Sequence, residues 1–176
     1  MDLSLTETQQ LIQDSTRDVV RNSFAKEVLL SLDDQTVPMT EALWQEAAQL
    51  GWMGMAIPEE YGGTGNSLTD VAVLFEELGR GPVPGPFFSS GVLGALTVLN
   101  AATEEQKCAW LPDMATGERI LALAVTEKRY GWTPGHVAME AKPADGGHRL
   151  NGTKLFVHDA ASATDLLVMA RTESGL

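Results

Sequence analysis

The spacing of apolar residues changes at about residue 118, and this change constrains the fold of the 176-residue chain more than any other feature. Before it, apolar side chains recur every three or four positions, which is typical of helices that bury one face. After it, short apolar runs alternate with glycine turns, which indicates strands. The sequence therefore predicts an α+β protein: an N-terminal all-α helical bundle of about five helices in residues 1–118, then an incomplete antiparallel β-domain in residues 119–176.

Capping motifs mark where three of these helices begin. Thr6 is followed three positions later by Gln9, and the same spacing separates Ser67 from Asp70 and Thr103 from Gln106, so each pair can satisfy free backbone N–H groups. A second helix is expected over residues 40–50. Residues 87–100 are apolar nearly all round, which predicts a central, buried fourth helix. Among the side chains expected to face the core are Leu11, Leu68, Val71, Leu74 and Leu78.

Proline and glycine divide the predicted elements from one another. Residues 33–38 are polar and end in proline, so they are expected to form a loop, and residues 81–86 are too rich in proline for a helix or a central strand. Strands are expected over residues 120–125, 137–142, 149–150, 153–158 and 165–171. Residues 145–147 and the Asn151-Gly152 pair supply turns between them.

Composition narrows the class of partner. The net charge of −12 argues against nucleic acid and against an anionic membrane surface, both of which attract basic proteins.

No apolar run is long enough to span a bilayer, residues 1–7 do not look like a signal peptide, and the one cysteine, Cys108, cannot form an internal disulfide. These features predict a cytoplasmic protein. The three histidines lack metal-ligand spacing, so no metal site is expected, and the pairs Glu76-Glu77 and Glu104-Glu105 are expected on solvated helix faces.

Several stretches resemble signatures of the acyl-CoA dehydrogenase family: residues 50–63, 76–80, 106–112 and 115–118. The connector at residues 83–87 is similar to that of actinobacterial members, some of which act on steroid side-chain thioesters. The resemblance covers the whole chain. It implies a complete N-terminal helical domain and part of the middle β-domain, with the family's C-terminal helical bundle, and the catalytic glutamate in it, outside these residues.

The resemblance also implies a flavin-binding segment at residues 123–127. In the family, backbone groups here, at Leu123 and Val125, and a threonine matching Thr126 border the isoalloxazine ring of FAD; a threonine at a strand end can instead bond its own backbone. Phe156 matches an aromatic residue that packs on the ring, and the alternative is a core aromatic on a strand. The sequence leaves both alternatives open.

Two departures from the family pattern bear on that segment. Where the family has a Gly-x-Gly-Ser-Asp loop, residues 128–133 keep a match only at Gly131, and Trp132 stands in place of the serine. A bulky indole there is expected to obstruct close approach of the backbone to a cofactor. His158 stands where a small hydroxyl residue usually bonds the flavin; it is either a hydrogen-bond donor to FAD or a solvent-facing histidine.

By resemblance, the expected reaction is α,β-dehydrogenation of an acyl-CoA, either fatty or steroid side-chain, with an electron acceptor such as electron-transfer flavoprotein. No catalytic residue is assigned within the chain, which is expected to be inactive alone and to work in a homo- or hetero-oligomer of acyl-CoA dehydrogenase subunits. The first hypothesis is thus a part of an acyl-CoA dehydrogenase that uses FAD in its full-length or assembled context. A second hypothesis is a flavin-free partner subunit of a mixed oligomer. The departures at residues 128–132 favour the second hypothesis, and the intact Val125-Thr126 pair favours the first.

Overall fold

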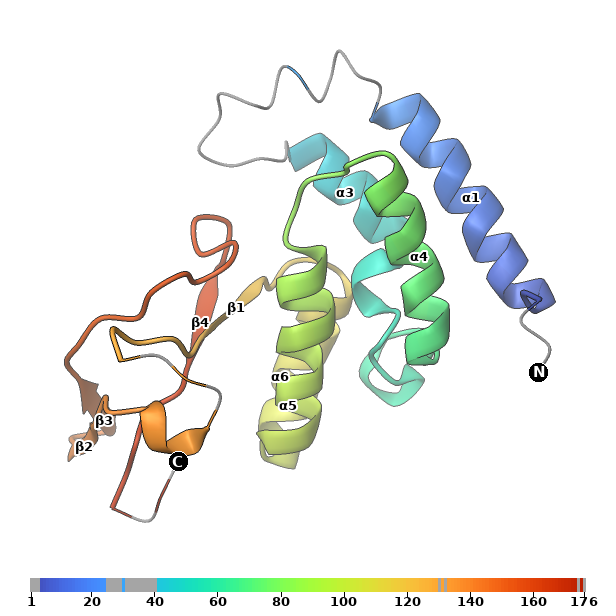
Figure 1. Ribbon diagram of the computed structural model, residues 1–176. Coiled ribbons are helices and arrows are strands. Elements are labelled where there is room, and N and C mark those ends of the chain that lie inside the picture. Colours follow the sequence, from blue (N-terminus) through green and yellow to red (C-terminus); the bar gives the residue numbers. More distant parts are fainter. Residues whose placement is uncertain are drawn as a thin grey trace.

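The computed structural model describes residues 4–24, 30, 41–129, 131, 133–173 and 175. Helices fill one side of the molecule and the strands lie on the other (Figure 1). The helical elements are α1 (Glu7–Ser23), α3 (Glu41–Gln49), η1 (Trp52–Gly54), η2 (Glu59–Tyr61), α4 (Leu68–Arg80), η3 (Phe87–Gly94), α5 (Ala95–Ala101), α6 (Glu104–Ala115) and η4 (Pro134–His136). The strands are β1 (Leu121–Ala124), β2 (Ala141–Ala144), β3 (Gly147–Leu150) and β4 (Asp165–Val168). The predicted fold class is confirmed, whereas the loop expected at residues 33–38 lies outside the described residues.

All three predicted capping boxes form. The hydroxyls of Thr6, Ser67 and Thr103 each accept a hydrogen bond from the backbone N–H three residues on, and the side chain at that third position reaches back to the cap. These caps satisfy N–H groups that the first turn of a helix leaves free, and so they fix where α1, α4 and α6 begin. None of the described helices is long and apolar enough to cross a membrane.

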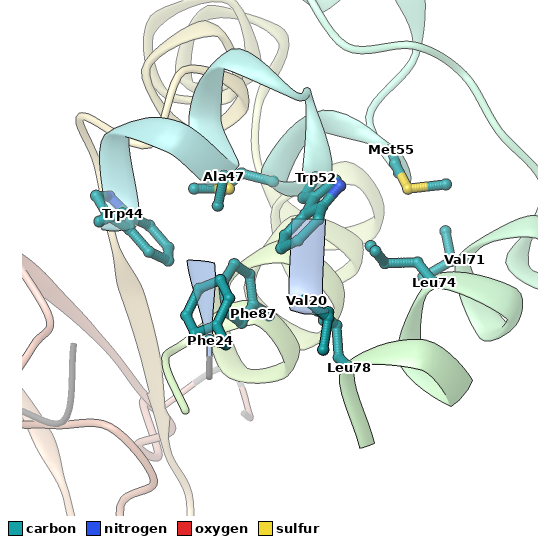
Figure 2. Packing of buried hydrophobic residues seen from close by; sticks show 11 residues of the cluster. Val20, Phe24, Trp44, Ala47, Trp52, Met55, Val71, Leu74, Leu78 and Phe87 are labelled. Atoms are coloured by element: carbon teal, nitrogen blue, oxygen red, sulfur yellow. The ribbon is translucent and has the colours of Figure 1, made fainter. Parts of the chain in front are cut away.

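The larger apolar core lies between α1, α3, η1, α4 and the start of η3. Figure 2 shows Trp44, Trp52 and Phe87 close together in it; the ring centroid of Phe87 lies 5.4 Å from that of Trp44 and 5.8 Å from that of Trp52. Two predicted core positions are wrong, because Leu11 is 70% exposed and Leu68 is 58% exposed. The faces that α1 and α4 bury instead carry Thr16 and Val20 on α1 and Val71, Leu74 and Leu78 on α4.

One carboxylate of the helical part is buried, contrary to the expected solvated face. Glu77 is 1% exposed and receives two hydrogen bonds from Arg17, from Nη2 at 2.8 Å and from Nε at 3.1 Å. Arg80 Nε lies 3.1 Å from the same carboxylate. The hydrogen bonds from Arg17 lower the pKa of Glu77, because they favour its charged form. This pair joins α1 to α4, whereas Glu76, Glu104 and Glu105 face solvent as predicted.

The helix predicted over residues 87–100 has two parts. η3 is a π-helix, and its last turn passes into α5 as the Ala95 N–H donates to Ser90 O. A Cβ atom on Gly94 would lie 3.0 Å from the Cβ of Leu121, so this face of η3 allows β1 to approach closely. The widened turn also carries Ser90, 3% exposed, to a position where its hydroxyl accepts from the Leu121 N–H at 3.1 Å.

The β part consists of two separate strand pairs. β2 and β3 form an antiparallel hairpin around the predicted turn at Asp145-Gly146, whereas β1 pairs with β4 in parallel, from Leu121 opposite Asp165 to Ala124 opposite Val168. The antiparallel prediction is therefore wrong for the second pair. Residues 137–139 and 153–157 are not strands, although both were expected to be.

The packing of α4 gives a direct test of the core. Leu74 is 1% exposed and Leu68 is 58% exposed, so the two leucines form a matched pair on one helix. We expect Leu74→Ala to lower the free energy of unfolding by about 2–5 kcal/mol, because it removes buried contacts and leaves a cavity. Leu68→Ala should change it by less than about 0.5 kcal/mol. Urea denaturation followed by circular dichroism measures both, and equal losses would contradict the assigned helix phase.

Candidate functional site

The candidate site is the backbone that follows β1. Leu121, Ala122 and Ala124 are buried, and β1 is held at one end by the bond to Ser90 and at the other by the Met169 N–H, which donates to Ala124 O at 3.1 Å. The strand thus delivers residues 125–127 to the edge of the β part, where they leave regular structure. Leu123 lies within β1 and is half-buried.

A second segment lies beside this edge. The Leu155 N–H donates to Thr126 O at 2.8 Å, so residues 155–158 run next to residues 125–127. The structure therefore brings together Val125, Thr126 and Phe156, which the sequence places about thirty positions apart. We call residues 125–127 and 155–158 the paired edge.

Glu127 and Lys154 stabilise the paired edge through hydrogen bonds to each other and to its backbone. Lys154 Nζ donates to Glu127 Oε1 at 2.8 Å and to Val125 O at 3.1 Å, and the Glu127 carboxylate also accepts from the backbone N–H groups of Ala138 and Met139 at 2.9 and 3.0 Å. The two side chains are only 12% and 7% exposed. The Lys154 hydrogen bond and the two backbone donors lower the pKa of Glu127 to about 2. A carboxylate so well paired is a structural anion and a poor proton acceptor.

The paired edge has polar groups without partners. Within the described part of the chain, the backbone N–H groups of residues 125–127 and 156–158 donate to no other group, and the Thr126 hydroxyl has no hydrogen bond. The alternative in which Thr126 bonds its own backbone is therefore not observed. These residues are partly or fully exposed, so their donors are accessible to a ligand or to further polypeptide at this edge.

Phe156 is the most exposed large apolar residue at the edge. Its side chain is 83% exposed, so the alternative of a core aromatic is wrong. Its backbone has φ of +52°, an unfavourable conformation for an aromatic residue, and it interrupts the strand predicted over residues 153–158. An exposed aromatic ring in a strained backbone is a feature of binding sites. His158 is also exposed and lies in a turn.

A hollow of about 300 Å³ opens next to the paired edge. Ala124, Met139, Lys154, Val157 and Val168 are among its lining residues. Its walls are mainly apolar, and Leu150 and Leu166, 43% and 51% exposed, also border it. The edge thus combines free hydrogen-bond donors with an apolar recess, which suits a flat ligand with polar margins.

The loop that departs from the family pattern folds back on itself. A Cβ atom on Gly131 would lie 2.4 Å from the His136 ring, so Gly131 sits directly against that imidazole. Thr133 Oγ1 lies 2.8 Å from His136 Nδ1 and completes the contact. Trp132 lies outside the described residues. The structure therefore does not bring Gly131 to the paired edge by any described contact.

Two residues that support the site were missed from the sequence. Lys154 follows the Asn151-Gly152 pair and resembles any surface lysine, and Ser90 lies in an apolar helix. A signal for Lys154 did exist: it is the one charged residue in residues 151–157, and it lies two positions before Phe156. Nothing in the sequence indicated that Ser90 would bond a strand 31 residues later.

Comparison with known proteins identifies the family. The model of the acyl-CoA dehydrogenase N-terminal domain matches residues 6–118. The chain belongs to the acyl-CoA dehydrogenase family.

Its relatives are about twice as long. A 3-(aryl)acrylate reductase of Clostridium sporogenes is 33% identical over 171 residues, which are 96% of this chain and 45% of the relative. A variant of the Tcur3481–Tcur3483 steroid ACAD has a TM-score of 0.83 and 32% identity, over 96% of this chain and 46% of that one. The FAD complex of PigA has a TM-score of 0.82 and 26% identity, over 98% and 45%. The chain thus spans less than half the length of these relatives.

The Glu127 carboxylate makes folding depend on pH. Because its folded pKa is about 2 and its ordinary value is 4.5, it contributes stability that is complete above about pH 4.5 and is lost as pH falls toward 2. We expect Glu127→Gln to lower the melting temperature at pH 7 and to flatten its fall between these pH values. Glu140→Gln is the control, since Glu140 is exposed and pairs only with the exposed Lys142 among the described residues. Parallel melting curves for wild type and Glu127→Gln across this range would contradict the assignment.

Proposed function

We propose that this chain supplies the helical domain and the flavin-facing edge of an acyl-CoA dehydrogenase. The observation that carries the proposal is the paired edge, where free N–H groups, the Thr126 hydroxyl and the exposed Phe156 ring converge beside an apolar hollow. Family membership and the likeness to the FAD complex of PigA support FAD as the ligand. A cytoplasmic location is part of the same proposal.

Each residue of the edge has a role toward FAD. When bound, FAD would supply the hydride acceptor of the reaction. The backbone at Val125 and the Thr126 hydroxyl would donate hydrogen bonds to the margin of the ring, where they stabilise negative charge. Phe156 would cover one face of the ring, and His158 would donate at its far side. Leu123, on β1, would contribute apolar support below the flavin ring. Gly131 would approach FAD only if its contact with His136 opened.

The proposed substrate is an acyl-CoA thioester, fatty or steroid side-chain, with its acyl tail between α4 and the η3–α5 helix. Glu127 is not a suitable base for the α-proton, because it is already held by Lys154 and two backbone donors. The base would come from polypeptide outside these residues or from another subunit. Electron-transfer flavoprotein is the proposed acceptor, and the assembly is a homo- or hetero-oligomer.

The Gly131–His136 contact favours a second candidate function. A loop closed on its own histidine leaves the cofactor without the backbone approach that the family's glycines provide. In this alternative the chain is a flavin-free partner in a mixed oligomer. The similar Tcur3481–Tcur3483 steroid ACAD is named for two components, which supports a comparison with a mixed oligomer.

Flavin binding separates the two candidates. We expect the purified protein to retain visible flavin absorbance after incubation with FAD and removal of unbound FAD, and Phe156→Ala to weaken FAD binding about three- to tenfold, the effect of losing one aromatic stacking contact. Phe88→Ala is a matched control, because Phe88 is also exposed, at 55%, but lies on η3. Binding that is absent in the wild type would favour the flavin-free partner.

Turnover tests the location of the base. We expect the isolated chain not to reduce ferrocenium or a dye anaerobically with any acyl-CoA of a chain-length and steroid series, because Glu127 is already paired and the glutamate base that the family resemblance implies lies outside these residues. The same assay with co-expressed acyl-CoA dehydrogenase subunits is the comparison. Turnover by the chain alone would contradict the proposal that the base comes from elsewhere.

A further inference from the structure

A single buried ammonium joins three segments beneath the paired edge. Lys154 Nζ donates to Val125 O and to the Glu127 carboxylate, and that carboxylate accepts in turn from the Ala138 and Met139 N–H groups. Residues 125–127, 138–139 and 154 are therefore held by one connected set of hydrogen bonds. Both charged side chains are nearly buried, so solvent screens the set only weakly.

Thr126 lies at the centre of this arrangement without taking part in it through its side chain. Lys154 fixes the carbonyl on one side of Thr126, the Glu127 carboxylate fixes the residue on the other side, and the Leu155 N–H fixes the Thr126 carbonyl itself at 2.8 Å. No described residue bonds the Thr126 hydroxyl or N–H. Three consecutive residues are thus restrained while their outward-facing donors stay available.

We infer that Lys154 is a positioning residue, which sets the donors of Thr126 and the ring of Phe156 for FAD through its bonds to Val125 and Glu127. The inference rests on the proposed function. Lys154 lies two positions before Phe156 and directly before Leu155, and its ammonium bonds Val125 and Glu127, so a shift of its side chain would affect both segments of the paired edge. Donors that are fixed before a ligand arrives lose nothing to reorganisation when charge develops on it.

The chemistry of the pair explains why lysine is needed. A compact ammonium can donate to two oxygen atoms that flank one residue, whereas a larger, planar guanidinium presents its donors in a different, fixed geometry. Removing the ammonium leaves Glu127 nearly buried with only its two backbone donors. The carboxylate then tends to turn toward water, which releases residues 138–139 as well.

The test compares Lys154→Met with Lys142→Met in the whole chain. Lys142 is 73% exposed and pairs only with exposed Glu140 among the described residues, so it controls for the loss of one positive charge. Two quantities are measured: amide hydrogen exchange at residues 138, 139 and 155, and the dissociation constant of FAD with its visible spectrum. We expect Lys154→Met to speed exchange at these amides and to raise the dissociation constant on the order of tenfold, as loss of a supporting contact typically does. Lys142→Met should change neither.

The possible failures differ from one another. Faster exchange in Lys154→Met with unchanged FAD affinity and spectrum would show a structural role only and would overturn the inference, and so would unchanged exchange. Either result leaves the proposed function intact. A wild-type protein that binds no FAD overturns the proposed function and the inference together. If Lys154→Met does not fold, Lys154→Arg keeps the charge and should bind FAD more weakly than wild type; equal binding would overturn the inference.

Discussion

The contact between β1 and η3 determines where the candidate site lies. The Leu121 N–H donates to the Ser90 hydroxyl, and the absence of a side chain at Gly94 lets the strand approach the π-helix. Because both Leu121 and Ser90 are buried, loss of this hydrogen bond would leave unpaired polar groups without access to water. The helical part thus fixes the start of β1, and the course of β1 fixes residues 125–127.

In both parts of the described chain, an ion pair with a buried or nearly buried carboxylate joins separate segments. Arg17 and Glu77 join α1 to α4, and Lys154 and Glu127 join the segments beneath the paired edge. Burying charges is costly, so such pairs are weak evidence for stability alone and better evidence for a defined geometry. The helical pair lies within packed helices, whereas the second pair supports an edge whose outward donors are free.

The sequence predicted the helical part well, because caps and apolar spacing are local signals. Thr6, Ser67 and Thr103 begin their helices as expected, and the errors at Leu11 and Leu68 concern only the phase of a helix face. The strands were predicted less well. Residues 137–139 lack strand structure, and the N–H groups of Ala138 and Met139 bond the Glu127 side chain instead, a contact that no local pattern reveals.

The candidate site was predicted only in part, for the same reason. The segments that carry Val125, Thr126 and Phe156 do lie side by side, and His158 is exposed nearby, yet their arrangement depends on contacts between segments far apart in the sequence. Ser90 and Lys154 act at distances of 31 and 27 residues along the chain, beyond the reach of any periodicity. Gly131 matched the family pattern but packs on His136, which local sequence could not indicate.

The central claim is that the free donors of the paired edge are a flavin site, and an FAD titration followed by two-dimensional amide NMR tests it most directly. At 18.9 kDa the chain suits this measurement. The account predicts that the amide signals of residues 125–127 and 156–158 shift on addition of FAD, while those of α1 and α4 stay in place. Shifts confined to the helices, or no shifts at all, would contradict it.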